Sequence, residues 1–242
     1  MTTMNPLGIS RSRAFWGQVR GFVFIFAALS ALRSAVADWN DVPTGSMVPT
    51  ILVGDRIFVN KLAYDLKLPF TTLHLATWSN PRRGDVIVLF SPADGQRLVK
   101  RVVALPGDVI ELRNNQLFLN GSPAQYNAVD PRILVQLNSG ERSGHTFATE
   151  TEPVAGAAAS AAHPHAVMGT PNLSARRSFG PIVVPPNQYF VMGDNRDNSF
   201  DSRYFGFVDR GRIVGRAVGV VASLDLDHHW VPRWGRFFES LH

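Results

Sequence analysis

Ser46 is the residue whose type and neighbours first suggest chemistry. It lies in Pro43–Thr50, PTGSMVPT, between Gly45 and Pro49. Proline restricts the backbone and glycine lets it approach a substrate closely, so this serine lies on a constrained turn. For the octapeptide alone, an ordinary loop serine is the simpler interpretation. A nucleophile at this position requires a base elsewhere in the chain.

Histidine is the usual base for a serine nucleophile. The surroundings of the seven histidines support none of them in that role: His74 is in a threonine-rich loop, His145, His163 and His165 are in an irregular region, and His228, His229 and His242 are near the end. The order of residues does not exclude a Ser-His-Asp triad. Lysine is the alternative base. The Ser-x-x-Lys pattern of penicillin-binding enzymes is absent, because Pro49 takes the lysine's position.

Lys100 is the best candidate base among only three lysines. It lies in Leu98–Val103, LVKRVV, an expected strand in which Lys100 and Arg101 point to opposite faces. One of the two can therefore be buried while the other is solvated. A free lysine has a pKa near 10.4, and burial among apolar side chains lowers it. The alternative is a surface lysine on an edge strand.

A polar segment, GDNRDNSFDSRYFG (193–206), follows another expected strand. It does not fit a calcium loop, because Arg196 takes a ligand position. A surface turn is one interpretation. The other is a loop fixed by charge-assisted bonds among Asp194, Arg196, Asp201 and Arg203. Ser199 could then exchange a hydrogen bond with a neutral lysine amine.

The elements that must position these residues begin with an N-terminal apolar segment. Residues 16–38 are long enough to cross a bilayer, with Trp16 and Trp39 at the two ends. Four arginines and no acid lie within residues 1–33. The positive-inside rule then puts the N-terminus in the cytoplasm and the rest outside. A cleavable signal peptide is the alternative, since Ala35-Val36-Ala37 resembles a cleavage site.

Charge and composition narrow the function classes for the remaining chain. The net charge is +5, but beyond residue 33 it is only +1, so the basicity does not indicate a nucleic-acid surface. Without cysteine there is no thiol nucleophile, disulfide or cysteine-based metal site.

Short Val-, Ile- and Phe-rich runs separated by glycine, proline and asparagine predict a mostly β chain. The expected strands are Arg56–Asn60, Val86–Phe90, Val99–Val103, Val109–Leu112, Gln116–Leu119, Ile182–Val184, Tyr189–Met192 and Arg212–Val221.

Residues 122–181 differ in composition, and we expect them to form an inserted cap region. Their only strand signals are the weak runs Ile133–Leu137 and Ala166–Met168. An alanine-rich stretch predicts a mobile loop at about 150–163. The aromatic and arginine-rich stretch at 230–238 is interpreted as a packed tail, with a membrane-surface contact as the alternative.

Taken together, these segments resemble the type I signal peptidases, membrane-anchored serine proteases with a Ser-Lys dyad. The resemblance covers about residues 33–121 and 179–221. Four motifs in order carry it: PTGSMVPTILVGD (43–55), RGDVIV (83–88), KRVVALPGD (100–108) and GDNRDNSFDSRYFG (193–206). Four motifs at the right spacing are far more specific than any one alone.

The resemblance implies a role for each candidate. Ser46 would be the nucleophile and Lys100 the general base, with the Ser46 N–H and the Thr44 hydroxyl as oxyanion hole. Thr44 stands where many relatives have serine. Ser199 would orient the lysine amine. Asp194, Arg196, Asp201 and Arg203 would support the dyad. Small substrate side chains would enter shallow pockets lined by Val42, Met47, Ile51, Leu98 and Val99.

The resemblance also implies the organisation of the chain. We expect a cytoplasmic tail (1–15), an uncleaved single transmembrane helix (16–38), a catalytic β domain (39–121 and 182–242) and the inserted cap (122–181). The predicted location is the bacterial inner membrane, with the catalytic domain on the periplasmic face. Arg33 and the helix would keep Ala35-Val36-Ala37 out of an extended conformation and so prevent self-cleavage.

The implied activity is removal of signal peptides from exported preproteins after a small-x-small site such as Ala-x-Ala. The implied partners are preproteins and membrane lipid, without nucleic acid, metal or other cofactor. Three alternatives remain open. They are a soluble Ser-Lys self-cleaving repressor, a peptidase dedicated to one substrate class such as a pilin, and a non-enzymatic membrane-tethered β-rich binding module.

Overall fold

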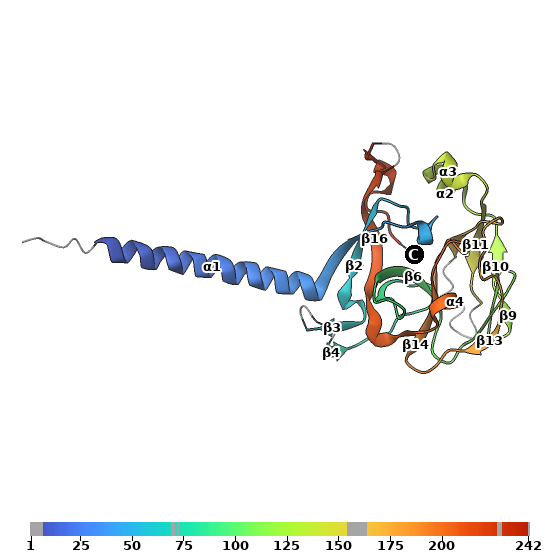
Figure 1. Ribbon diagram of the computed structural model, residues 1–242, viewed down its shortest axis with the longest axis horizontal. Coiled ribbons are helices and arrows are strands. Elements are labelled where there is room, and N and C mark those ends of the chain that lie inside the picture. Colours follow the sequence, from blue (N-terminus) through green and yellow to red (C-terminus); the bar gives the residue numbers. More distant parts are fainter. Residues whose placement is uncertain (1–6, 69–70, 72, 154–163, 227–228, 242) are drawn as a thin grey trace, which may run out of the picture.

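The computed structural model of the protein describes residues 7–68, 71, 73–153, 164–226 and 229–241. Helix α1 (Leu7–Val36) extends away from a β-rich body, so that only its C-terminal end contacts the rest (Figure 1). Across these described ranges, no helix combines the length and the hydropathy that a membrane span requires. The mostly β fold predicted from the sequence is confirmed.

The body contains many short strands and few helical turns. The strands are β1 (Ala37–Asp41), β2 (Asp55–Asn60), β3 (Asp65–Lys67), β4 (His74–Thr77), β5 (Val86–Phe90), β6 (Arg97–Ala104), β7 (Val109–Arg113), β8 (Gln116–Leu119), β9 (Ser122–Pro123), β10 (Gln125–Asn127), β11 (Thr146–Thr151), β12 (His165–Gly169), β13 (Phe179–Val183), β14 (Gln188–Met192), β15 (Val208–Asp209), β16 (Ile213–Asp225) and β17 (Val231–Pro232). The helices are α2 (Pro131–Gln136), α3 (Ser139–Arg142) and α4 (Ser202–Phe205), with 3-10 turns η1 (Gly45–Met47), η2 (Lys61–Ala63), η4 (Arg210–Arg212) and η5 (Trp234–Arg236).

The largest sheet brings together strands from both ends of the chain. Its order is β1-β2-β16-β5-β6-β14-β15, with β17 added to β16. All eight strands expected outside 122–181 are present, with ends shifted by a few residues. The shared sheet explains why the motifs at 43–55, 100–108 and 193–206 meet.

Strands β5 and β6 are covered on both faces, which places β6 in the interior. Val86 and Val88 pack in one apolar cluster, whereas Ile87 and Leu89 pack in another on the opposite face. This period-2 alternation is that of a strand buried on both sides. Strand β6 lies between β5 and β14. It is therefore not an edge strand, and side chains on either of its faces are removed from water.

The expected turns form where the sequence permits a positive φ. Asn120 and Gly121 connect β8 to β9 with φ angles of 51° and 82°. Gly107 has a φ of 87° in the turn that follows β6. Both conformations are accessible to glycine or asparagine at low cost. The β7–β8 hairpin uses Asn114 and Asn115 in the same way, with φ angles of 50° and 64°.

The chain leaves α1 earlier than the expected boundary at residue 38. Ala37 and Asp38 already belong to β1, whose register with β2 pairs Ala37 with Asn60. Strand pairing therefore ends the helix at Val36. Within the small-x-small sequence, Ala35 and Val36 are helical and only Ala37 is extended.

Residues 122–181 contain more regular structure than the sequence predicts. Strands β10, β11 and β12 form a separate three-stranded sheet, and β13 joins β7, β8 and β9. The expected strand Ala166–Met168 is present within β12, but the prediction of a strand at Ile133–Leu137 is wrong. Helix α2 forms there, because Pro131 begins it and the Asp130 side chain caps the N–H of Arg132. Most of the loop expected at 150–163 lies outside the described residues.

Candidate active site

Ser46 and Lys100 meet although they come from different elements. Ser46 lies in η1, between β1 and β2, and Lys100 lies in the middle of β6. The Lys100 Nζ donates a hydrogen bond of 2.7 Å to the Ser46 Oγ and a second of 3.0 Å to the carbonyl of Val99. The lysine side chain is only 2% exposed. A half-buried hydroxyl and a buried amine are thus in direct contact.

Burial changes the chemistry of the lysine. Desolvation lowers the pKa of Lys100 to about 8, because the charged ammonium loses its hydration. The carboxylates of Asp201 and Asp194 oppose this change, and the charge of Arg203 reinforces it. An appreciable fraction of the amine is therefore neutral near neutral pH and can accept a proton.

The backbone of Ser46 is held by the polar loop 193–206. The Asn195 N–H donates to the carbonyl of Ser46 at 3.1 Å, and the Asn195 side-chain amide donates to the carbonyl of Gly45 at the same distance. Gly193 packs directly against this point. A Cβ built on Gly193 would lie 2.4 Å from the Ser46 carbonyl oxygen and 2.3 Å from the Ser199 Oγ. The absence of a side chain at Gly193 therefore lets Ser46 and Ser199 come together.

The loop is fixed in turn by Asp201. This carboxylate accepts hydrogen bonds from the Gly193 N–H at 3.0 Å and from the Arg203 guanidinium, Nε and one terminal nitrogen each at 2.8 Å. Burial would raise the pKa of Asp201, but its bonds to Arg203 keep the pKa below its usual range. Ser199 lies in the same buried segment. One pair from the expected set of four charged residues, Asp201 with Arg203, is thus present in the loop that packs against Ser46.

Asp194 pairs differently from the expected arrangement. Its partner is Arg101, through Nε at 2.9 Å and a terminal nitrogen at 2.8 Å, and the Thr50 hydroxyl adds a bond of 2.6 Å. Lys100 and Arg101 are thus both buried, although they point to opposite faces of β6 and one of them could have been solvated. Both are buried because β6 is an interior strand, and Asp194 provides the charge that Arg101 needs on its own face.

Arg196 connects the loop to the region expected to be a cap. Its guanidinium forms two bonds with Glu150 of β11, one of 2.7 Å. The Met168 N–H donates to the Asp194 carbonyl, and the Arg196 N–H donates to the Met168 carbonyl, each at 2.8 Å. Met168 of β12 therefore pairs with the backbone of the polar loop, and the 122–181 region helps to hold that loop in place.

A buried cluster of Glu150, Glu152 and His165 has the donor types of a metal site, with donor atoms within 4.8 Å of one another. Its surroundings are nevertheless cationic. Arg196 bonds both oxygens of Glu150, and burial together with the charge of Arg101 lowers the pKa of His165 to about 4. Arg196 neutralises the Glu150 carboxylate directly, so one of the three donor groups is already held in an ion pair.

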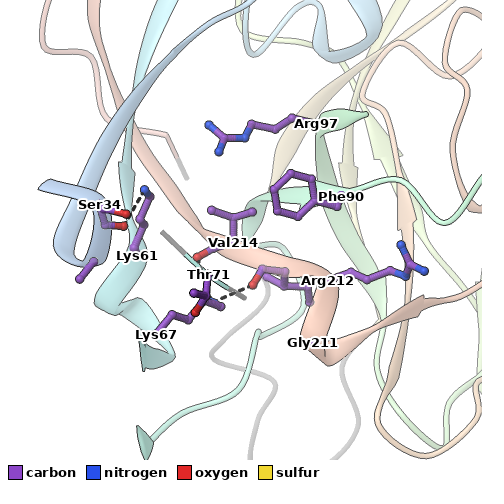
Figure 2. Close-up of a pocket in the computed structure, with 11 residues that line it drawn as sticks. Ser34, Lys61, Lys67, Thr71, Phe90, Arg97, Gly211, Arg212 and Val214 are labelled. Carbon is purple, nitrogen blue, oxygen red and sulfur yellow. Dashed lines mark hydrogen bonds between the residues drawn. The ribbon is translucent and has the colours of Figure 1, made fainter. Parts of the chain in front are cut away.

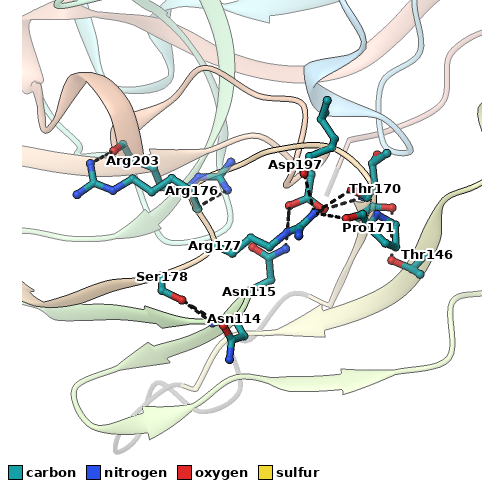
Figure 3. Close-up of polar contacts among 12 residues, drawn as sticks. Asn114, Asn115, Thr146, Thr170, Pro171, Arg176, Arg177, Ser178, Asp197 and Arg203 are labelled. Carbon is teal, nitrogen blue, oxygen red and sulfur yellow. Dashed lines mark hydrogen bonds and ion pairs between the residues drawn. The ribbon is translucent and has the colours of Figure 1, made fainter.

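Asp197 links the outer side of the same loop to two neighbouring segments (Figure 3). It accepts hydrogen bonds from Arg177 and Asn115, each at 2.9 Å, and from the Thr170 N–H at 2.7 Å. Arg176 donates to the carbonyl of Arg203 at 2.6 Å. The loop carrying Ser199 and Asp201 is thus held by the β7–β8 turn and by the connection between β12 and β13.

The remaining expected site residues lie around η1 and β6. Thr44 has an extended backbone and an exposed side chain immediately before η1. Of the five expected pocket residues, four share one apolar cluster: Val42, Met47, Ile51 and Val99. Leu98 packs in the cluster on the other side of β6, with Tyr64 and Leu89. The alternation of side chains along a strand separates Leu98 from Val99.

Sequence reasoning missed several residues that shape the site. Two of them, Gly193 and Asn195, belong to the polar loop and contact residues 45–46. The other three contact the loop from outside: Arg101, Glu150 and His165. Gly193 and Asn195 lie inside a recognised motif, so their position alone could have indicated a role. Glu150 and His165 come from a region with weak patterning, and no local signal distinguishes them.

Comparisons with known proteins agree on one family. The family model "Signal peptidase, peptidase S26" matches residues 15–222. Signal peptidase I of Pseudomonas fluorescens is 35% identical over 90% of this chain and 74% of its own length. That of Buchnera aphidicola subsp. Acyrthosiphon pisum is 29% identical over 90% of this chain and 78% of its own length. A crystal structure of a signal peptidase I from Enterococcus faecalis aligns with a TM-score of 0.34 at 33% identity, over 58% of this chain and 98% of that one.

Proposed function

The chain belongs to the signal peptidase family, peptidase S26, and we propose that Ser46 is its nucleophile and Lys100 its general base. The activity is proteolytic removal of signal peptides from preproteins, as in relatives at 29–35% identity over 90% of the chain. The dyad assignment rests chiefly on the 2.7 Å contact between the Lys100 Nζ and the Ser46 Oγ, in a site where the lysine is buried.

The proposed reaction proceeds through an acyl-enzyme. Neutral Lys100 accepts the hydroxyl proton of Ser46 as the Ser46 oxygen bonds to the scissile carbonyl carbon. The Ser46 N–H and the Thr44 hydroxyl stabilise the resulting oxyanion. Collapse of the intermediate breaks the C–N bond, and the Lys100 ammonium gives its proton to the leaving amine. Lys100 then activates a water that hydrolyses the ester.

Ser199, Asp201 and Arg203 would position this dyad without taking part in bond making. Ser199 and the Ser46 carbonyl both pack on Gly193, and Asp201 holds the Gly193 N–H. Asp194 and Arg196 would fix the other part of the loop through Arg101 and Glu150. The apolar cluster of Val42, Met47, Ile51 and Val99 beside Ser46 is the proposed recognition surface for small side chains before the scissile bond.

Helix α1 is proposed as the anchor that keeps the enzyme at the bacterial inner membrane, with the β-rich body on the periplasmic side. Phe22, Phe24 and Phe26 are each 74% exposed, which is unfavourable in water and favourable in lipid. Membrane fractions extracted with alkaline carbonate should retain the wild type and lose a Phe24→Arg/Phe26→Arg variant. Retention of both equally would contradict the anchor.

The dyad is tested by cleavage of a purified preprotein with an Ala-x-Ala site. Ser46→Ala and Lys100→Met should both abolish cleavage while remaining folded, because each removes one of the two reacting groups. Arg113→Met is the matched control, since Arg113 is an exposed cation on β7 paired with Glu111. If Lys100→Met cleaves the preprotein as fast as the wild type, the general base is another residue. Cleavage of only one substrate class by the wild type would favour a dedicated peptidase.

A further inference from the structure

A second site lies where α1 meets the body. A cavity of about 510 Å³ is lined by the C-terminal end of α1 at Ser34, by Lys61 and Lys67 and by Phe90 and Arg97 (Figure 2). Neither Ser46 nor Lys100 lines it. The proposed reaction therefore does not use this cavity, and its residues require a separate explanation.

Cations outnumber carboxylates around this cavity in the part of the chain that the structure describes. Asp38 is shared by Lys61, at 3.4 Å, and Arg97, at 3.3 Å. Asp65 is likewise shared by Lys67 and Arg210, each at 2.7 Å. Two carboxylates therefore serve four cations, and the cavity keeps an excess of positive charge.

Two of these cations can still donate to a ligand. Figure 2 shows Lys61 and Arg97 on different sides of the cavity, with Phe90 beyond Arg97 and Val214 below both cations. Lys61 donates to the Ser34 carbonyl at 2.9 Å and pairs with Asp38, and an ammonium has three hydrogens. Among the described contacts, Arg97 uses only one terminal nitrogen, toward Asp38 and Asn40. Both cations approach the same oxygen of Asp38, so an oxyanion would bind beside this carboxylate and receive charge-assisted hydrogen bonds from the remaining Lys61 and Arg97 donors.

The neighbouring cations Lys67 and Arg212 add positive charge around the cavity, but their N–H groups are directed to other partners. Lys67 directs its ammonium to Asp65 and to the carbonyls of Ile213 and Val214. The Arg212 guanidinium points away from the cavity in Figure 2 and donates to the carbonyl of Ser91. The ligand-facing donors are thus Lys61 and Arg97, and the walls around them are partly apolar.

The depth of the cavity relative to α1 indicates which anion it would hold. Ser34 lies two residues before the end of the helix at Val36, just beyond the exposed apolar run. If α1 spans the bilayer, as the proposed function requires, this end lies at the level of the lipid headgroups. We propose that the cavity binds the phosphate of an anionic phospholipid, between Lys61 and Arg97, with the apolar walls against its glycerol and first methylenes.

The test uses the full-length protein in a neutral detergent at fixed ionic strength. Its thermal unfolding is followed while dihexanoyl phosphatidylglycerol, dihexanoyl phosphatidylcholine or inorganic phosphate is added, because a ligand that binds the folded state raises the midpoint. Lys61→Gln/Arg97→Gln is compared with Arg113→Gln/Arg132→Gln, which removes two exposed, ion-paired cations elsewhere. Phosphatidylglycerol should raise the midpoint of the wild type and the control, and the first variant should need at least about tenfold more.

Several outcomes would overturn the assignment. Equal responses of the two double variants exclude the cavity. If inorganic phosphate raises the unfolding midpoint as much as phosphatidylglycerol does, the cavity is a general anion site. If phosphatidylcholine raises it as much, binding does not depend on the net negative charge of the lipid. If the Lys61→Gln/Arg97→Gln variant does not fold, Arg97→Gln alone replaces it, because this side chain is 38% exposed. Preprotein cleavage is measured in parallel without added lipid, so a wild type that cleaves preprotein but does not respond to phosphatidylglycerol refutes only the headgroup site.

Discussion

The carbonyl oxygen of Ser46 lies against the α-carbon of Gly193, so closely that a Cβ atom on Gly193 would come within 2.4 Å of it. The proposed nucleophile is thus held by backbone contact with the polar loop as well as by its bond to Lys100. The Asn195 N–H, two residues further on, donates to the same oxygen. The position of Ser46 therefore depends on a residue that has no side chain.

Gly193→Ala should inactivate the enzyme while leaving it mostly folded. The added methyl group must displace the Ser46 backbone or the Ser199 side chain, and overpacking of this kind costs about 1–3 kcal/mol. We expect kcat/KM to fall by about 10²-fold or more, because misplacing a nucleophile by an ångström has an effect of that size. Gly180→Ala is the control, since a Cβ there meets no atom within 4 Å. Equal activity of both variants would remove the positional role of Gly193.

The pH profile of cleavage should report the Lys100 amine. Its pKa of about 8 requires kcat/KM to fall about tenfold per pH unit below pH 8, where the lysine is protonated, and to level off above. Among the charges that raise the pKa of Lys100, that of Asp201 contributes most. Asp201→Asn should therefore move the acid limb of the pH profile to lower pH, even if the maximal rate drops. An unchanged limb in that variant would mean that another group titrates.

Lys100→Met should be more stable than the wild type at neutral pH. The folded-state pKa of about 8 lies below the ordinary lysine pKa of 10.5, so burying the lysine costs stability as pH falls through this interval, and the full cost applies below pH 8. Methionine removes that cost, and we expect a gain of about 1–3 kcal/mol in unfolding free energy at pH 7. Urea unfolding at pH 7 and pH 10.5 measures it. The gain should shrink at the higher pH, and a constant difference would contradict it.

Arg101→Met should destabilise the fold strongly. The guanidinium is fully buried with Asp194, and removing one partner of such a pair leaves an uncompensated charge, at about 3–5 kcal/mol. Arg113→Met removes an arginine that is 62% exposed and paired with Glu111, and it should cost no more than about 1 kcal/mol. Chemical unfolding of both variants gives the comparison. Similar losses would show that the Arg101–Asp194 pair contributes little.

Glu152→Gln should stabilise the protein at alkaline pH. Burial and the charge of Glu150 raise the pKa of Glu152 from 4.5 to about 7. The folded state therefore resists ionisation of this group, and its contribution to stability is lost as pH rises from about 4.5 through 7. The neutral amide avoids this, so the variant should gain about 1–3 kcal/mol over the wild type at pH 8 and little at pH 4.5. Thermal unfolding at the two pH values measures the difference, which would be equal at both if Glu152 did not titrate.

The sequence alone predicted eight of the strands outside residues 122–181. Short apolar runs at Val86–Phe90 and Gln116–Leu119 predicted two strands with their observed ends, and Asn120-Gly121 predicted the turn after the second. Local patterning succeeds there because burial of alternate side chains and a positive φ are local requirements. It failed at Ile133–Leu137, where an N-terminal proline and an aspartate cap favour a helix over the apolar run.

Family motifs in the sequence also identified Ser46, Lys100 and the polar loop, but not how the charged residues pair. The expected set of Asp194, Arg196, Asp201 and Arg203 contains only one internal pair, Asp201 with Arg203. Asp194 instead binds Arg101, and Arg196 binds Glu150. The sequence determined which residue types were available, and the tertiary structure decided their partners. A buried charge takes the nearest opposite charge in space, and that distance is set by which strands become neighbours in the sheet and not by separation along the chain.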